Sequence, residues 1–261
     1  MLLFRNIVFT AVIAGLLSGL LMTVMQSFST VPLILQAETY ENAGGEEAGH
    51  SHAHDAAPVA GTAAPTAALA AADHHHDDEA WAPADGFERL FYTSGANILS
   101  AIGFGLLLIA VAEALGGLGG WRNGLMFGIA GFLTVSLAPG LGLPPELPGM
   151  PAAELGPRQV WWMSTVVCTA LGLALLAYTR SALLAAVAIL LLIAPHIIGA
   201  PLPPTHDTAV PMELHARFVN AVYATNLVFW AVLGVIAGLV REKFRAGEVE
   251  VAGSNRELAA H

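Results

Sequence analysis

Residues 160–200 read VWWMSTVVCTALGLALLAYTRSALLAAVAILLLIAPHIIGA. This stretch contains two apolar runs, 160–179 and 182–200, and only a short polar turn at 179–181 separates them. A helix needs about 20 mostly apolar residues to cross the hydrocarbon core of a bilayer, and each run has about that length. The stretch therefore predicts two membrane-spanning helices joined by a tight turn.

Four further apolar runs bring the expected number of spanning helices to about six. They are approximately 7–28, 95–115, 122–139 and 217–240. The first run follows Arg5 in the manner of a signal peptide. However, the chain stays apolar to about Leu35, which exceeds the roughly 7–15 residues of a signal-peptide core. We therefore expect a retained span and an all-α integral membrane protein.

The composition agrees with a membrane protein and excludes several functions. The chain is 56% hydrophobic and only 11% charged, whereas soluble domains carry roughly 25% charged residues. Its net charge of -10 argues against nucleic acid as a partner, because phosphates are neutralised by basic patches. No phosphate-binding Walker loop, nucleophile elbow or zinc-protease motif is present, so we expect no enzyme.

The distribution of Lys and Arg predicts the orientation. With six spans and a cytoplasmic N-terminus, seven basic residues lie inside and three outside, as positive-inside orientation favours. The inner residues are Arg5, Arg122, Arg180, Arg241, Lys243, Arg245 and Arg256, and the outer residues are Arg89, Arg158 and Arg217. We therefore expect both termini in the cytoplasm of a bacterial cell, with the chain in its inner membrane.

The segment 42–86 separates the first span from the others. It consists mainly of Ala, Gly, Pro, His and acidic residues, and such a sequence buries too little apolar area to offset its ordering entropy. We expect a first helix with its outer exit (1–41), then a disordered periplasmic loop (42–86). A membrane domain with about five more helices (87–240) and a cytoplasmic tail (241–261) follow.

A weak internal repeat predicts how the spans pair. Pro-rich segments at 139–149 and 195–204 are each followed by an acidic residue and an Arg at the start of the next helix, and the first hairpin shows a fainter form. This suggests three helix hairpins around a central path. Glycines four residues apart, as in Gly124/Gly128 and Gly234/Gly238, indicate close helix packing in lipid.

Histidines in the outer loop are the strongest chemical signal. They are spaced as His-x-His-x-His-Asp and as Asp-His-His-His-Asp-Asp-Glu. Imidazole and carboxylate are natural ligands of borderline divalent metals such as Co, Ni and Zn. The loop is therefore expected to capture metal ions and raise their local concentration. The predicted ligands are His50, His52, His54, His74, His75 and His76.

Two further groups at the outer helix ends are metal-ligand candidates. Glu38 and Glu41, three residues apart on one helical face, could form an acidic mouth, although a solvated helix end explains them equally well. The second group follows the fifth run, where polar groups at membrane depth favour a cavity or a partner. Its members are His196, His206, Asp207, Glu213 and His215.

Several segments together resemble one known family. They are Pro32–Glu41 (PLILQAETYE), Gly142–Gly149 (GLPPELPG) with Arg158-Gln159-x-Trp161-Trp162, and Ala194–Pro201 (APHIIGAP). With the histidine loop they cover most of the chain, and they resemble the CbtA family of proposed cobalt transporter subunits. Members are usually described with about five spans, whereas the positive-inside count favours six here.

The resemblance implies import of cobalt for cobalamin synthesis and a small membrane partner, CbtB. It implies no resident cofactor, because the metal ion would be the cargo. A permease for Ni or Zn remains an alternative. So does a membrane receptor that binds metal without transporting it and hands it to a partner. A membrane enzyme is disfavoured, because no helix carries a tight set of metal ligands.

Overall fold

The computed structural model describes residues 2–49, 83–84 and 86–258, and all regular secondary structure in these residues is helical. The helices are α1 (Leu2–Phe28), α2 (Thr30–Gly49), α3 (Phe87–Ala114), α4 (Gly120–Gly131), the π-helix η1 (Phe132–Leu137), α5 (Ala138–Gly142), α6 (Leu155–Tyr178), α7 (Ala182–Ile198) and α8 (Met212–Leu258). The expected all-α class is therefore confirmed.

Five helical segments are long and apolar enough to cross a membrane. They are Leu3–Phe28, Phe87–Ala114, Gly120–Gly142, Leu155–Tyr178 and Met212–Arg245. The remaining expected span forms α7, which is apolar but has only 17 residues. At 1.5 Å per residue α7 is about 25 Å long, slightly less than the roughly 30 Å hydrocarbon core. The protein is thus a multi-span membrane protein, and a sixth span stays a prediction.

Prolines explain two irregularities in these helices. A proline ring clashes with the carbonyl four residues earlier, and the residue has no N–H to donate. The ring of Pro32 therefore clashes with the helical position of the Phe28 carbonyl, and α1 ends at Phe28 before α2 begins. Pro139 follows the π-helix η1, which interrupts the segment Gly120–Gly142. Such π turns occur often at functional sites, and η1 contributes to the pocket described below.

The segment after α2 differs in part from the expectation. Residues 42–49, predicted to begin a disordered loop, continue α2 to Gly49. Adding a residue to an existing helix is far less costly than starting one, which favours such an extension. Residues 50–82 lie outside the described residues, and so do the six histidines of the loop.

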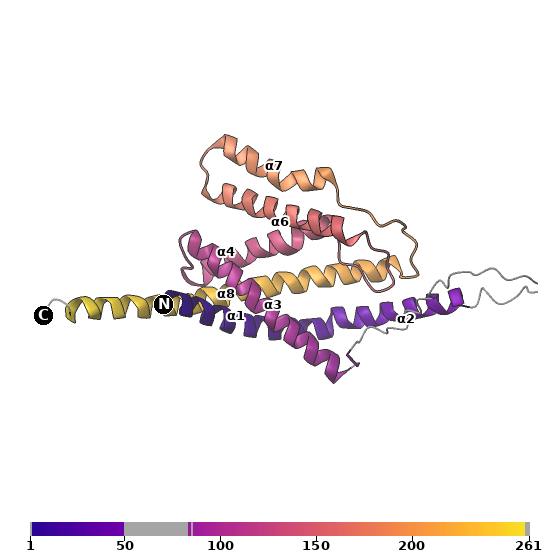
Figure 1. Ribbon diagram of the computed structural model, residues 1–261, viewed down its shortest axis with the longest axis horizontal. Helices are drawn as coiled ribbons and strands as arrows, with labels where there is room; N and C mark the ends of the chain where they lie inside the picture. The colour runs from indigo at the N-terminus through magenta and orange to yellow at the C-terminus, as the bar shows by residue number, and fades with distance from the viewer. Residues whose placement is uncertain (1, 50–82, 85, 259–261) are drawn as a thin grey trace, which may run out of the picture.

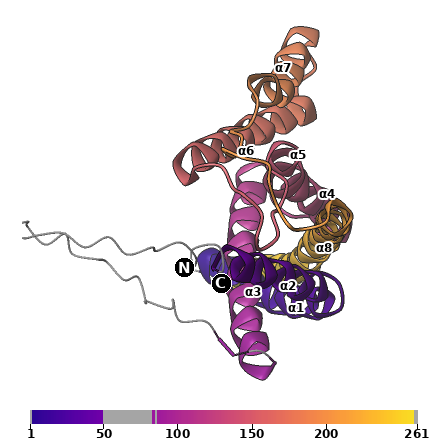
Figure 2. The ribbon, with the colours of Figure 1, turned by 90° about the vertical axis from the view of Figure 1, so that its right-hand side faces the viewer.

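The packing of the helices corrects the predicted three hairpins. The first hairpin is present, since α1 packs along α3. The third is not, because α7 packs chiefly on α6, whereas α8 packs on α4 and α1. Figures 1 and 2 show the α6–α7 pair projecting from the group formed by α1, α3, α4 and α8. The glycine-rich faces of α4 and α8 approach each other closely, which explains why α8 packs on α4 and not on α7.

The two ends of the molecule differ in character. The start of α1 and the end of α8 lie at one end, which we call the inner end (Figure 1). The start of α8, α2 and the segments 143–154 and 199–211 lie toward the opposite, outer end. The arrangement of both chain termini at one end agrees with an even number of membrane crossings.

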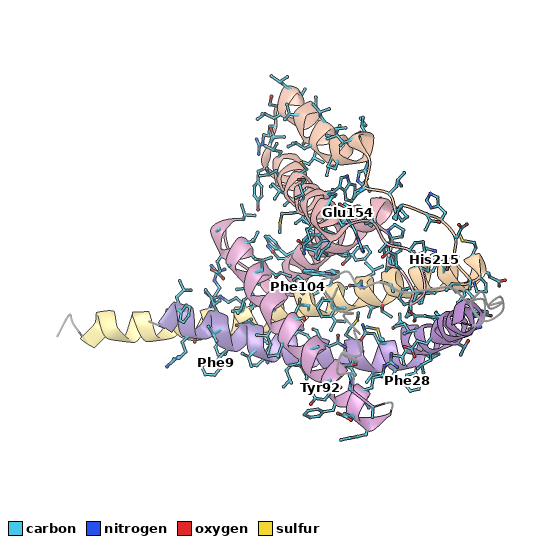
Figure 3. The ribbon with its side chains drawn as sticks, turned by 45° about the vertical axis from the view of Figure 1, so that its right-hand side comes forward. Phe9, Phe28, Tyr92, Phe104, Glu154 and His215 are labelled. Carbon is cyan, nitrogen blue, oxygen red and sulfur yellow. The ribbon has the colours of Figure 1, made fainter. Side chains whose placement is uncertain are left out.

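Apolar side chains fill the interior and also cover the outside. Phe104 of α3 meets Trp230 of α8 at a ring-centroid distance of 5.1 Å inside the main core cluster. Figure 3 shows Phe104 facing the bundle, whereas Phe9, Phe28 and Tyr92 lie on its surface. Phe28 is 84% exposed. Large exposed apolar side chains along the spans are what a lipid-facing surface requires.

Candidate functional site

The predicted acidic mouth is partly neutralised. Glu38 of α2 forms an ion pair with Arg89 of α3, with 2.7 Å between Oε1 and Nη2, and about a third of each side chain is exposed. Glu41 is exposed, and its Cβ lies beside Gly149 of the α5–α6 connection. The two carboxylates therefore have different surroundings, although they lie on one helical face.

A second ion pair lies at the same end of the molecule. Arg158 in the first turns of α6 contacts Glu146 of the preceding connection at 3.2 Å. The repeat predicted acid and Arg residues at the starts of three helices. For Arg89 and Arg158 the recorded partner is a Glu from the preceding outer segment, which ties that segment to the helix.

His196 lies at the carboxyl end of α7, beside the indole of Trp161 on α6. Their ring centroids are 5.9 Å apart in an edge-to-face arrangement. The Trp161 Nε1–H donates a hydrogen bond to the Pro195 carbonyl at 3.2 Å, so the proline and the indole join α7 to α6. His196 itself is exposed. Its exposure and its contact with the Trp161 ring suit packing at the membrane interface.

Three of the predicted residues lie on the outer surface. His206 and Asp207 are exposed in the α7–α8 connection, and Glu213 is exposed in the first turn of α8. The Asp207 carboxylate accepts a hydrogen bond from the Thr205 hydroxyl at 3.1 Å. Among the recorded contacts of the described residues, none joins Asp207 to the His206 ring. A carboxylate–imidazole pair of these two neighbours, which would fix the tautomer of the histidine, is therefore not formed in this structure.

His215 is a predicted ligand whose ring contacts another part of the protein. It is half-buried on α8, and its Nε2 lies 3.0 Å from the Pro145 carbonyl of the α5–α6 connection. A neutral ring with its proton on Nε2 would donate this hydrogen bond. Figure 3 shows the position of His215 near the outer end of α8. The contact links α8 to the Pro-rich segment Gly142–Gly149, one of the segments that carry the family resemblance.

The described residues contain no group of three or more His, Cys, Asp or Glu side chains close enough to hold a metal ion. Within this part of the chain, the predicted ligands of the outer end are thus spread along several elements. The six loop histidines fall outside it, and their part in metal binding stays a prediction.

An open pocket of about 180 Å³ lies between η1–α5, α6 and α8. Its polar lining comes from Ser136, Tyr223 and Asn226, and Trp162, Gly140 and Pro145 complete much of the wall. Sequence reasoning missed it, because one hydroxyl or amide in an apolar run is a weak signal. A Cβ at Gly140 would lie 2.5 Å from the Tyr223 Oη, so glycine makes room for the phenol.

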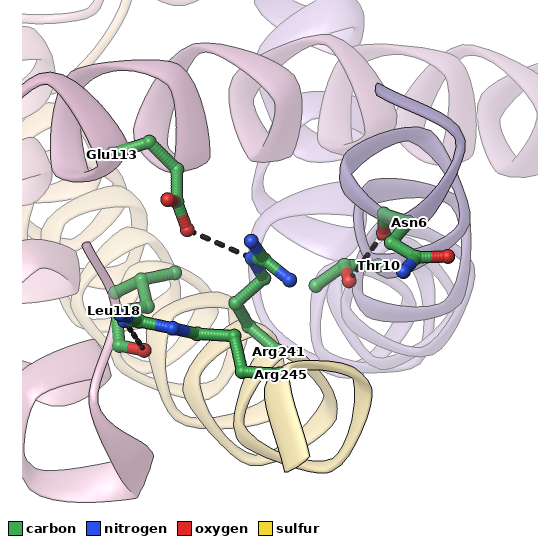
Figure 4. A network of polar contacts seen from close by, with 6 residues as sticks. All are labelled: Asn6, Thr10, Glu113, Leu118, Arg241 and Arg245. Carbon is green, nitrogen blue, oxygen red and sulfur yellow. Dashed lines mark hydrogen bonds and ion pairs between the residues drawn. The ribbon is translucent and has the colours of Figure 1, made fainter. Parts of the chain in front are cut away.

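Polar contacts join α8 to the end of α3 and the α3–α4 connection at the inner end (Figure 4). Arg241 of α8 is 1% exposed, and its Nε donates to Glu113 Oε1 of α3 at 2.8 Å. One turn further, Arg245 Nη1 donates to the Leu118 carbonyl at 3.3 Å. In α1 the Thr10 hydroxyl donates to the Asn6 carbonyl at 2.7 Å, and both residues are buried. The two arginine contacts fasten α8 to the end of α3 and to the α3–α4 connection.

These features define a polytopic α-helical membrane protein with an ion-paired outer end, a polar pocket and a closely tied inner end. The chain matches the model of a family described as "Probable cobalt transporter subunit (CbtA)" over residues 4–242, and it belongs to this family. The resemblance stated from the sequence is thereby confirmed. The family implies a metal ion as cargo and, since its members are subunits, a partner. No curated protein and no solved structure matches the chain.

Proposed function

We propose that the chain is the membrane subunit of a permease that imports a divalent transition-metal ion, namely cobalt for cobalamin biosynthesis. The match to the cobalt transporter subunit family over residues 4–242 carries this proposal. The several long apolar helices agree with it, because a permease has to cross the bilayer. A small membrane protein of the CbtB type is the proposed partner, and the membrane is the bacterial inner membrane.

In this proposal the periplasmic segment 42–86, with its six histidines, captures the ion, and the membrane domain 87–240 moves it inward. Near the outer mouth, Glu41, Glu213 and the α7–α8 connection supply negative charge and imidazole, and Glu38 adds its carboxylate, which is paired with Arg89. Moving a dication inward across about 100 mV releases roughly 4–5 kcal/mol. The membrane potential alone could therefore concentrate the ion, and no ATP-binding motif is needed in this chain.

Uptake of radioactive cobalt tests the proposal. Cells that produce this chain with its small partner should accumulate cobalt faster than cells that produce the partner alone. Parallel assays with nickel and zinc identify the preferred ion. The variants His196→Ala and His215→Ala test two outer residues separately. Wild-type uptake in both would remove these histidines from the path, and equal uptake with and without the chain would reject the permease.

A metal receptor that does not transport is the second candidate. The absence of a three-ligand metal group in the described residues favours it, since a receptor needs ligands only in its outer loop. Purified chain in liposomes separates the two functions. Metal influx without the partner supports a permease. Metal binding that yields influx only after the partner is added supports a receptor that delivers its ion.

A further inference from the structure

The pocket between η1–α5, α6 and α8 lies where an ion entering from the outer end could bind on its way through the membrane. His215 contacts the Pro145 carbonyl, and Pro145 lines the pocket. His215, Val222 and Asn226 are separated by seven and four residues, so they follow one face of α8. From His215 to Asn226 the helix descends about 16 Å at 1.5 Å per residue. The pocket therefore continues from the outer loops to membrane depth.

The polar atoms at the deep end of the pocket are held in place. Trp230 Nε1 donates to Ser136 Oγ at 3.2 Å, and Ser136 Oγ donates to Asn226 Oδ1 at 3.4 Å. Asn226 Nδ2 donates one of its two N–H groups to the Val222 carbonyl at 2.9 Å. Both Asn226 Oδ1 and Ser136 Oγ keep a lone pair that can accept another hydrogen bond. These two oxygens can therefore accept hydrogen bonds from a ligand in the pocket.

The size and charge of the pocket fit a cation that keeps its water. A volume of about 180 Å³ has room for several water molecules, since about 10–15 Å³ of such volume is enough for one. A small dication with part of its hydration shell can therefore enter, and its waters are strong hydrogen-bond donors. No Lys or Arg side chain is among the residues lining the pocket, so no fixed positive charge repels a cation.

Neutral oxygen ligands also suit a transient site. A charged carboxylate or thiolate at membrane depth would bind a transition-metal ion tightly and slow its release. Conduction requires binding that is favourable enough for the ion to arrive and weak enough for it to leave. Ser136, Tyr223 and Asn226 supply hydroxyl and amide oxygens and no charge.

We propose that this pocket binds the transported dication with water still attached, through hydrogen bonds from its waters to Asn226 Oδ1, Ser136 Oγ and Tyr223 Oη. His215 and the Pro145 carbonyl mark its outer opening. The inference rests on the proposed transport function and adds to it a binding site that contains none of the predicted ligands.

Cobalt uptake in cells that also produce the small partner tests the residues. Asn226→Leu and Ser136→Ala should each lower the initial rate at subsaturating cobalt by about tenfold, as loss of groups that hydrogen-bond to metal-bound ligands does. The matched control is Asn220→Leu, an exposed residue on the same helix, which should keep the wild-type rate. Wild-type uptake by Asn226→Leu would overturn the proposal.

Thiol labelling tests the pocket independently of transport. In a Cys168→Ala background, Ser136→Cys should react with a small cationic thiol reagent added outside, and millimolar Co²⁺ should slow the reaction. The control Ala209→Cys, exposed in the α7–α8 connection, should react at the same rate with or without Co²⁺. A Ser136→Cys thiol that stays unlabelled, or that Co²⁺ does not protect, rejects the pocket. Absence of uptake by the wild-type chain with its partner rejects the transport function instead.

Discussion

Arg241 shows how one residue can take a role that its sequence context conceals. Together with Lys243 and Arg245 it forms a basic cluster after the last apolar run, which is typical of a cytoplasmic anchor. In the structure its side chain is 2% exposed and is paired with Glu113 from α3. A basic cluster alone does not reveal which of its members faces a neighbouring helix, because that depends on how α8 meets α3.

Removing the charge of Glu113 should therefore destabilise the protein. Glu113→Gln leaves a buried guanidinium without its carboxylate, and breaking a buried ion pair on one side costs about 3 kcal/mol or more. The melting temperature of the purified protein in detergent should fall clearly. Glu242→Gln is the matched control, since Glu242 is exposed on α8 and exposed substitutions usually change stability by less than about 0.5 kcal/mol. Equal melting of the two variants would contradict this role of Glu113.

The pocket residues mark the limit of sequence reasoning at the same scale. Among the predicted ligands, His215 was recognisable as a histidine near the end of an apolar run. Ser136, Tyr223 and Asn226 carry ordinary polar groups, and they are 87 to 90 positions apart between η1 and α8. Only the crossing of α4 and α8 brings them together, so no local pattern could identify them.

The crossing of α4 and α8 is the decisive feature among the helices. The spacing of Gly124, Gly128, Gly234 and Gly238 predicted close packing, and this is confirmed, because a Cβ at any of them would collide with the opposite backbone. Glycine spacing defines a face of a helix but does not name the helix that it meets. The pairing of α8 with α4 was therefore missed, and the predicted hairpin of α7 with α8 was wrong.

A single methyl group at this crossing should have a large effect. In Gly124→Ala the new Cβ would overlap the Gly234 carbonyl oxygen, so the two helices would have to separate. The matched control is Gly103→Ala on α3, where nothing lies within 4 Å of the added Cβ. The control should be neutral or slightly stabilising, because Ala favours helix over Gly by about 1 kcal/mol. Thermal unfolding of both variants in detergent measures the difference. Similar melting temperatures would show that α4 and α8 do not touch here.

For the whole molecule, hydrophobic length predicted most of the fold. All six apolar runs became helices, since about 20 apolar residues without charge have few other ways to satisfy their backbone in lipid. The largest difference in boundaries is at the inner end of α8, which continues from the expected end at 240 to Leu258, and the others lie mainly at outer helix ends. There, acidic first-turn residues such as Glu88 and Glu213 extend the helices beyond the apolar runs. Whether α7 crosses the whole bilayer depends on its surroundings in the membrane, which its sequence does not contain.

The orientation of the chain is the prediction on which the transport direction depends. With both termini inside, the α7–α8 connection faces the periplasm and the Arg241–Arg245 segment faces the cytoplasm. In a Cys168→Ala background, Thr205→Cys should react with a thiol reagent that cannot cross the inner membrane, whereas Lys243→Cys should react only after the cells are opened. Both positions are exposed, so their access differs only by side. The reverse pattern would place the α7–α8 connection, with His206 and Asp207, in the cytoplasm, where it could not capture metal for import. That pattern would arise if the whole chain were inverted or if α7 did not cross the bilayer. Labelling of both residues in intact cells would mean that α8, which lies between them in the chain, does not cross the bilayer.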